Sequence, residues 1–359
     1  MGNQLDSGQN KNRLLNDEEI FTLQKHFANR DEKGDLRLGE SWNYIEDGLK
    51  RNIQDYLTVK GEGISLAKYQ DSAANSLKGS KDQQFSFLCM LVFQGESVVQ
   101  VEKLISTLTS LFSSFTNIYS PSHSGKVECL SLSLSLLHDT LYPGLKRKQT
   151  IGAEFDPYIE VDTGTLENIF IYNPLLELVL QNILAHCFQL KHLEFKIGVP
   201  YQESIFPLLS LLFLNYNLPS LYKDTWRSLF SIRRDGESFS KFSGLIINRG
   251  PSLIIIKDNE GNVFGGYCSS SWKPGPNFIG SSECFLFQLH PQLNIYDSTP
   301  FNTNYQYFNL KQKTMPNGLG MGGQLEYFGF WIDAEFGIVR TSPSCSTFHS
   351  PQLGVQVSS

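Results

Sequence analysis

A short stretch in the last third of the chain restricts the fold more than any other. Leu253–Ile256 and Val263–Tyr267 are apolar runs rich in branched and aromatic residues. The segment between them contains five turn-forming residues, Asp258–Asn262, which are Asp, Asn, Glu and Gly. Branched and aromatic side chains fit a pleated, buried surface, while Asn and Gly tolerate the positive φ of a tight turn. The pattern therefore predicts a β-hairpin.

Further short apolar runs follow the hairpin, separated by Gly, Pro, Asn and Ser. Strands this short with turn residues between them are typical of an all-β sandwich or barrel. The glycines at positions 318, 320, 322 and 323 are interpreted as a tight corner between strands, because neither a helix nor a Lys–Ser/Thr pair accompanies them as in a phosphate-binding loop. The predicted strands cover residues 283–289, 294–296, 305–308, 327–332 and 336–340.

Residues 226–348 carry a pattern that resembles the TLDc domain family. The matching residues are Trp226, Leu229–Ser231, Arg234–Gly236, Ser238–Phe239, Gly250–Leu253, Asp258, Gly261, Val263–Gly266, Trp272, Phe278, Gly280, Glu283–Phe287, Gly322–Gly323 and Trp331–Asp333. The resemblance implies a two-sheet antiparallel β-sandwich flanked by helices, which would give the whole chain an α+β fold. It also implies a function without catalysis, since such domains bind the vacuolar H⁺-ATPase and some members protect cells against oxidative damage.

The chain before this region is predicted to be helical. Asn16–Glu19 has the form of a capping box, and Val98–Phe112 places apolar residues on one helical stripe. Leu130–Leu136 alternates as a strand would, but its leucines also fit a helix, which its helical neighbours favour. Residues 142–163 are the best linker, and Asn173 with Pro174 marks another helix start.

We therefore expect four parts along the chain. They are a flexible tail over 1–12, an EF-hand-like helical region over 13–84, a second helical region over 85–217 and the TLDc β-sandwich over 218–359. Members of the family typically finish with a further strand and often add a C-terminal helix. The resemblance thus implies that the last strand either is missing here or is supplied by Val355 and Val357.

Residues 29–40 have the layout of an EF-hand calcium loop. Gly34 holds the sixth place, where the sharp turn needs it, but Lys33 and Arg37 hold the fifth and ninth places. A cation at a ligand position removes an oxygen and repels Ca²⁺, so we expect a structural relic without a metal. A calcium-responsive adaptor stays an alternative. The degenerate loop positions that bear oxygen are Asn29, Asp31, Asp35 and Glu40.

Gly2 is the one candidate for lipidation. The myristoylation motif has Ser or Thr at position 6, where this chain has Asp6. The resemblance nevertheless implies a myristoylated Gly2, because lysosomal and vacuolar members with helical N-terminal regions typically begin Met-Gly. The longest apolar run, Ile205–Leu214, is too short to span a bilayer. We therefore expect a cytoplasmic protein that associates peripherally with the lysosomal or vacuolar membrane.

Composition narrows the remaining function classes. A net charge of −6 argues against nucleic acid as a partner. The six cysteines include no CxxC pair, which favours buried, reduced thiols. An oxidation-resistance protein with a reactive Cys268 or Cys284 is an alternative. No cofactor motif is found, and Ser282, His290 and Asp297 lack the sequence context of a catalytic triad.

The leading hypothesis is a binding protein. The chain looks similar to the mTOR-associated TLDc proteins of lysosomes, so the resemblance implies vacuolar-type H⁺-ATPase subunits and the mTOR complex as partners. The carboxylates of Glu283 and Asp333 adjoin apolar strands and need a partner. Arg233 or Arg234 could supply an internal ion pair, and contact with another protein is the alternative. The predicted partner-binding residues are Arg233, Arg234, Asp235, Glu283, Gly322, Gly323 and Asp333.

Overall fold

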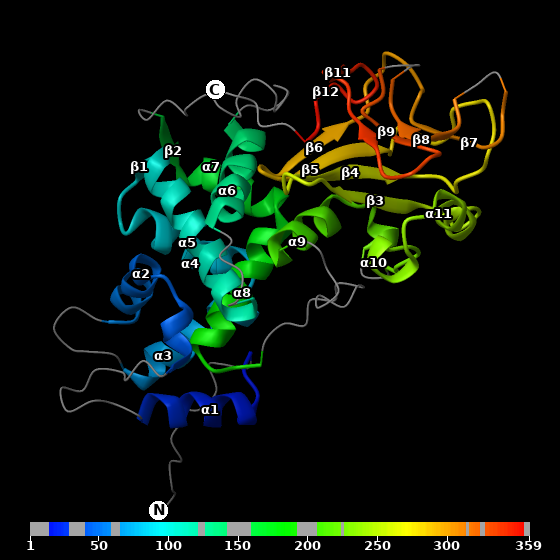
Figure 1. Cartoon of the computed structure of the whole chain (residues 1–359). Coiled ribbons are helices and arrows are strands. Elements are labelled where there is room, and N and C mark those ends of the chain that lie inside the picture. The colour runs from blue at the N-terminus through cyan, green and yellow to red at the C-terminus, as the bar shows by residue number, and fades with distance from the viewer. Residues whose placement is uncertain are drawn as a thin grey trace, which may run out of the picture. The chain divides into compact units, whose positions relative to one another are not determined.

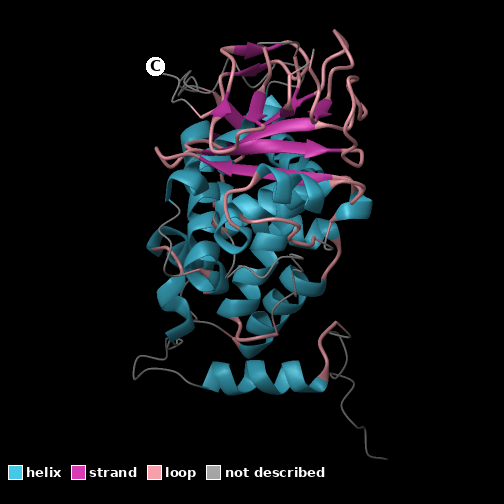
Figure 2. Ribbon diagram, turned by 45° about the vertical axis from the view of Figure 1, so that its right-hand side comes forward, coloured by secondary structure: helices cyan, strands magenta, loops and turns pink. Residues whose placement is uncertain are grey.

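The computed structural model confirms a mixed α+β fold (Figure 1). The described residues belong to two compact units, the first reaching residue 191 and the second beginning at 207. The first is mostly helical, and the second carries the two large antiparallel sheets (Figure 2). The structure describes residues 14–28, 40–58, 65–120, 126–141, 159–191, 207–223, 226–313, 316–323 and 327–354.

The first unit contains helices of moderate length and one small β-ladder. Its strands β1 (Val98–Gln100) and β2 (Glu160–Asp162) are antiparallel. Its helices are α1 (Asp17–Ala28), η1 (Glu40–Tyr44), α2 (Asp47–Leu57), α3 (Leu66–Lys78), α4 (Lys81–Phe93), α5 (Val101–Tyr119), α6 (Lys126–Leu141), α7 (Thr163–Tyr172) and α8 (Pro174–Cys187).

Side-chain capping explains where some of these helices begin, among them α1 and α4. The Asn16 side chain accepts from the Glu19 amide, and the Glu19 carboxylate accepts from the Asn16 amide, both at 2.9 Å, which confirms the predicted capping box. Ser80 and Gln83 form a second box at the start of α4. The Leu130–Leu136 segment lies within α6, as the helical alternative predicted.

Two predictions in this unit were wrong. Val98 belongs to β1 rather than to the long helix, and β2 occupies part of the predicted linker. The reason is tertiary, because Val99 pairs with Val161 and both are buried. Helix α8 does begin at Pro174, but the Asn173 amide donates to the Ile169 carbonyl at 2.7 Å instead of capping it.

The second unit contains two four-stranded antiparallel sheets and short helices. The first sheet has the order β3 (Ser252–Lys257), β4 (Val263–Cys268), β5 (Phe285–His290), β6 (Asn294–Asp297). The second has the order β10 (Val339–Arg340), β9 (Phe330–Asp333), β8 (Gly318–Met321), β7 (Gln306–Asn309). The remaining elements are α9 (Leu208–Asn217), η4 (Ser220–Tyr222), α10 (Ile232–Asp235), α11 (Phe239–Ile246), β11 (Ser344–Cys345) and β12 (Ser350–Pro351).

The predicted hairpin is β3 and β4, joined by the turn Asp258–Asn262. The Asp258 carboxylate accepts from the amides of Glu260 at 3.0 Å and Asn262 at 2.8 Å, and Gly261 has φ +91°. Asn262 also donates through its side-chain amide to the carbonyl of Gly354 at 2.5 Å. The turn therefore fixes both its own backbone and the C-terminal end of the described chain.

The interpretation of Gly318 and Gly320 as part of a corner was wrong, since both lie in the inner strand β8. A Cβ on Gly320 would lie 2.7 Å from Cε3 of Trp331, so only glycine lets this indole lie against the strand. A strand whose glycines leave room for a neighbouring indole lacks the branched residues by which strands are recognised in a sequence.

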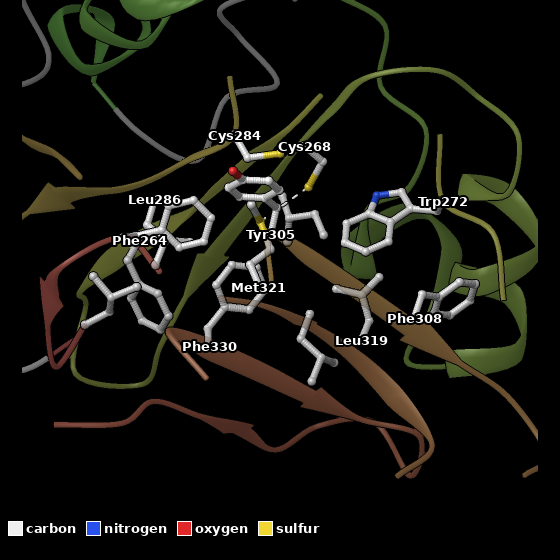
Figure 3. Close-up of a cluster of buried hydrophobic side chains, with 14 of the residues drawn as sticks. Phe264, Cys268, Trp272, Cys284, Leu286, Tyr305, Phe308, Leu319, Met321 and Phe330 are labelled. Atoms are coloured by element: carbon white, nitrogen blue, oxygen red, sulfur yellow. Dashed lines mark hydrogen bonds between the residues drawn. The ribbon is translucent and has the colours of Figure 1, made fainter. Parts of the chain in front are cut away.

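The core of the second unit lies between its two sheets (Figure 3). The sheets approach closely at Gly266 on β4, where a Cβ would lie 3.0 Å from Cε of Met321 on β8. Trp272 is buried and donates through its indole to Ser252 Oγ at 3.0 Å. Other buried members of this core are Phe242, Phe264, Leu286, Phe308, Leu319, Phe330, Phe348 and Leu353.

Candidate protein-binding site

The predicted partner-binding residues separate into two groups. Gly318 pairs with Asp333 at one end of β8, and Gly322 follows the other end, about 13 Å away at 3.3 Å per residue. The Phe336 ring, three residues after Asp333, packs 5.9 Å from the Phe230 ring just before α10. We call this the α10 end, which contains Arg233, Arg234, Asp235 and Asp333.

The other group lies at the end that we call the Thr347 end. Gln306 on β7 pairs with Met321, the residue before Gly322. The Gln306 side chain also lies against Gly280 and, at 3.7 Å, against Cys284. Glu283 is therefore at the same end of the sandwich as Gly322 and Gly323. We define the Thr347 end as residues 280–284, 297–304, 322–323, 327–328 and 344–349.

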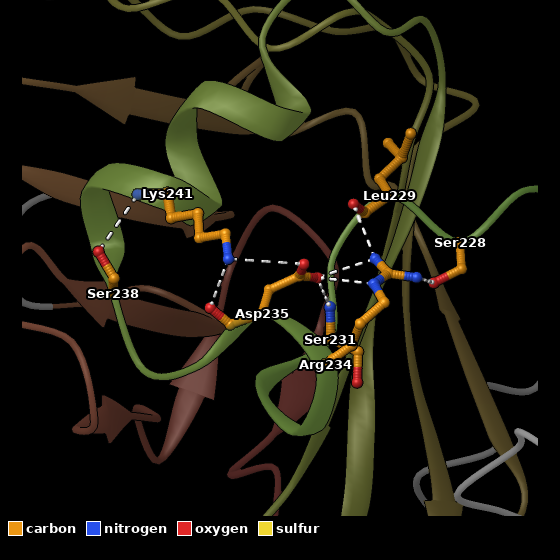
Figure 4. Close-up of polar contacts among 7 residues, drawn as sticks. All are labelled: Ser228, Leu229, Ser231, Arg234, Asp235, Ser238 and Lys241. Carbon is orange, nitrogen blue, oxygen red and sulfur yellow. Dashed lines mark hydrogen bonds and ion pairs between the residues drawn. The ribbon is translucent and has the colours of Figure 1, made fainter.

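The α10 end is organised around the carboxylate of Asp235 (Figure 4). Arg234 donates to Asp235 Oδ2 from Nε at 3.1 Å and from Nη2 at 2.8 Å, and the Ser231 amide donates at 3.0 Å. The Arg234 hydrogen bond, followed by that of Ser231, lowers the pKa of Asp235. The same guanidinium donates to Ser228 and Leu229. Arg234 is thus largely committed to holding α10 in place.

The predicted ion pair between Arg234 and Glu283 or Asp333 was wrong, because its partner is the adjacent Asp235. Asp333 instead accepts from the Glu335 amide at 3.1 Å and closes a turn. Glu283 is exposed, so its carboxylate needs no internal partner. Arg233 is also exposed and has no ion pair within the described part of the chain. Its role in partner binding stays a prediction.

Gly322 and Gly323 are buried and have φ values of +76° and +77°. A Cβ on Gly322 would lie 2.5 Å from Cys345 Sγ and 2.8 Å from the Phe348 ring. The amide of Gly323 donates to the Thr347 hydroxyl at 2.6 Å. These glycines let the chain turn tightly against the 344–349 segment. Direct contact with a partner at these two positions stays a prediction.

Thr347 connects three segments of this end. Its hydroxyl donates to Asn302 Oδ1 at 2.8 Å, and its carbonyl accepts from the Thr299 amide at 2.7 Å. Asn302 also donates to Ser346 Oγ at 3.1 Å. The segments around residues 299–302, 322–323 and 346–347 are therefore held in one arrangement.

The sequence did not identify two functional candidates at this end. Phe301 and Tyr327 are 71% and 64% exposed. Tyr327 was expected within a strand and Phe301 lies between predicted strands, so no pattern marked either as exposed. Their only sequence signal is an aromatic residue beside turn-forming residues.

The cysteines are placed for packing rather than for reaction. Cys268 and Cys284 are buried, and burial raises the pKa of Cys268, which disfavours the nucleophilic thiolate. The Cys268 thiol donates to Met321 Sδ at 3.3 Å. Cys89, which is half-buried, has its pKa raised to about 11, first by burial and then by Glu167. These surroundings do not support the reactive-cysteine alternative.

The strand register separates two residues of the catalytic triad considered above, His290 and Asp297. Asp297 pairs with Phe285 at the start of β5, whereas His290 ends that strand about 17 Å further along.

Among the residues that the structure describes, no cluster of three metal-ligating side chains occurs. None of the described helices combines the length and apolar composition that crossing a membrane requires. Gly2, Asn29, Asp31 and Asp35 lie outside the described residues, and only the backbone of Glu40 is described.

Comparison with known proteins identifies the class of the second unit first. Residues 200–358 match the family model of the TLDc domain. The two-sheet sandwich is therefore a TLDc domain, as the resemblance implied.

Longer matches then identify the family of the whole chain. It is 30% identical over 338 residues to the Homo sapiens MTOR-associated protein MEAK7, covering 87% of this chain and 73% of that protein. It is 46% identical over 179 residues to the Xenopus laevis protein of that name, covering 49% of this chain and 37% of the relative. Human nuclear receptor coactivator 7 is 28% identical over 132 residues, 36% of this chain and 13% of that protein. The chain belongs to the MEAK7 family of TLDc proteins.

Proposed function

We propose that this chain is a non-enzymatic regulator that binds the vacuolar-type H⁺-ATPase through its TLDc domain and associates with the mTOR complex. Its family membership supports the mTOR link, since its relatives are named for that association. The TLDc resemblance supports the ATPase as partner. The observation that carries a binding role is the pair of exposed aromatic residues on a hydrogen-bonded frame at the Thr347 end.

Binding alone is sufficient for regulation. A protein that contacts one assembly state of the ATPase better than another shifts the population toward that state, with no bond made or broken. Exposed aromatic and arginine side chains are the types that most often dominate protein interfaces. Phe301, Tyr327 and Arg233 supply such side chains in the second unit.

Membrane association is proposed to be peripheral. A myristoyl chain on Gly2 would give weak, reversible attachment to the lysosomal or vacuolar membrane, and the ATPase would supply the remaining affinity. Calcium is not proposed to take part, because Lys33 and Arg37 occupy ligand positions of the 29–40 loop.

Affinity purification from lysosomal membranes tests the proposal. The full chain is compared with a chain that ends at residue 199, before the TLDc match. We expect ATPase and mTOR complex subunits with the full chain, and loss of the ATPase subunits with the shortened one. A Gly2→Ala variant should reduce membrane recovery while retaining the ATPase from detergent extracts. Absence of ATPase subunits from the full-chain sample would reject the proposal.

A further inference from the structure

The Thr347 end presents aromatic surface in an unusual setting. Single exposed apolar residues are common and need no explanation. Here, however, Phe301 adjoins Asn302, and the Tyr327 backbone lies against Gly323. Asn302 and Gly323 both bond to the completely buried hydroxyl of Thr347. The two rings are thus presented by one framework rather than by independent loops.

Further hydrogen bonds hold that framework. Thr299 Oγ1 donates to the Ser346 carbonyl at 2.7 Å and accepts from the Phe301 amide at 3.4 Å. The Gly322 amide donates to the Tyr305 carbonyl at 3.0 Å. A surface whose backbone is already ordered loses less conformational entropy when a partner binds.

The fixed charges at this end are carboxylates. Glu283 is exposed, and its neighbour Ser282 accepts a 2.7 Å hydrogen bond from Ser298, which attaches it to the segment that leads to Phe301. Asp297 is exposed on the paired strand. The residues that define the Thr347 end include both of these carboxylates and one histidine, His349, but neither lysine nor arginine. Aromatic faces and carboxylates together attract cations.

We propose that the Thr347 end binds a basic segment of a partner protein. Arginine or lysine side chains of that segment lie over Phe301 and Tyr327 and pair with Glu283. The inference deepens the proposed function by naming the partner chemistry that the TLDc domain recognises. It does not require that the partner is the ATPase.

A peptide-binding measurement on the full chain tests this surface. The probe is a fluorescent peptide in which arginine alternates with serine, and its control has glutamate in place of every arginine. Anisotropy should show binding of the arginine peptide only, weakening as salt rises because exposed charges are screened. Phe301→Ala, Tyr327→Ala and Glu283→Lys should each weaken binding by about threefold or more.

Matched variants separate this surface from general acidity. Phe21 on α1 is 67% exposed, and Glu237 is an exposed carboxylate between α10 and α11. Phe21→Ala and Glu237→Lys should leave the peptide affinity unchanged. Circular dichroism and the thermal midpoint confirm that each variant remains folded, as expected for substitutions of exposed side chains.

The outcomes are distinct. Equal binding of the two peptides, or loss of affinity in the control variants as large as in the Phe301 and Tyr327 variants, overturns the inference. Capture of the ATPase by the full chain without any binding of the arginine peptide also overturns it, while the proposed function stands. Binding of the arginine peptide with the expected variant pattern, but without ATPase capture, supports the inference and rejects the ATPase as partner.

Discussion

The amide of Gly323 donates a 2.6 Å hydrogen bond to the hydroxyl of Thr347, and both residues are buried. That hydroxyl in turn donates to Asn302, so one small side chain joins three segments that lie far apart in the sequence. The arrangement fixes the aromatic end of the TLDc domain more firmly than the apolar packing around it could alone.

Replacing Thr347 by valine tests this role. The variant keeps the side-chain shape but leaves the buried Gly323 amide without its acceptor, while Asn302 Oδ1 keeps only the hydrogen bond from the Asn304 amide. We expect the free energy of unfolding to fall by about 1–3 kcal/mol. Urea unfolding followed by tryptophan fluorescence measures the change. Thr303→Val, at an exposed position nearby, should shift the midpoint little, and an equal shift in both variants would contradict the assigned role.

The contact between Gly266 and Met321 offers a second test, since the two sheets approach closely there. A Cβ at Gly266 would press on the Met321 side chain and lie 3.1 Å from Leu286 Cδ2. We expect Gly266→Ala to cost about 1–3 kcal/mol through overpacking. Its cost should shrink in a Met321→Ala background, because neighbouring substitutions couple.

The control for that experiment is Gly244→Ala. Gly244 lies on α11, and a Cβ there would have no atom within 4 Å. Thermal unfolding should show this variant to be as stable as the parent or slightly more stable, since alanine favours a helix. Strictly additive effects of Gly266→Ala and Met321→Ala would show that the two residues do not press on one another.

The Asp235 carboxylate should make stability depend on acid pH. Its pKa in the folded state is lowered from the ordinary value of 3.8, mainly by the Arg234 hydrogen bond and then by the Ser231 amide. A carboxyl with a lowered folded-state pKa stabilises the fold at pH values above 3.8, and this contribution is lost as the pH falls through the folded-state value. The parent should therefore exceed Asp235→Asn in stability at neutral pH, and the gap should close in acid. A gap that is independent of pH would contradict this assignment.

His26 should also make the stability of the fold depend on pH. It does so at higher pH values than Asp235, and the cause is burial rather than an ion pair. Its Nδ1 lies 2.6 Å from the Tyr69 hydroxyl, and burial lowers the pKa of His26 below its ordinary 6.5. As the pH falls, His26 is therefore protonated in the unfolded chain before it is protonated in the folded one. Its contribution to the free energy of unfolding is fully present above pH 6.5 and decreases as the pH drops from 6.5 toward the folded-state pKa. Thermal midpoints at several pH values measure this slope, which His26→Gln should reduce. An unchanged slope in that variant would assign the effect to other groups.

Local signals in the sequence predicted the parts of the fold that local interactions determine. The capping box at Asn16 and the turn at Asp258–Asn262 use hydrogen bonds between residues at most four positions apart. Such contacts can be inferred from residue type and spacing alone.

Most of the errors involve contacts between residues that are distant in sequence. The remaining one concerns which of several carboxylates an arginine pairs with. Strand β8 was missed because its glycines accommodate Trp331, which only the folded sheet brings near. Strand β2 was assigned to a linker because its one buried residue, Val161, pairs with Val99, which lies far earlier in the sequence. The Arg234 ion pair was assigned to a distant carboxylate although Asp235 stands next to it. Exposure of Phe301 and Tyr327 likewise follows from turns that only tertiary contacts define.

The hydrogen bond from Asn262 to the Gly354 carbonyl has a practical consequence for labelling. The β3–β4 turn lies at the Val263 end of β4. It is about 17 Å along that strand from Cys268, which neighbours the Thr347 end. A fluorophore or affinity handle attached beyond Gly354 thus starts beside this turn. It would leave Phe301 and Tyr327 unobstructed for capture experiments.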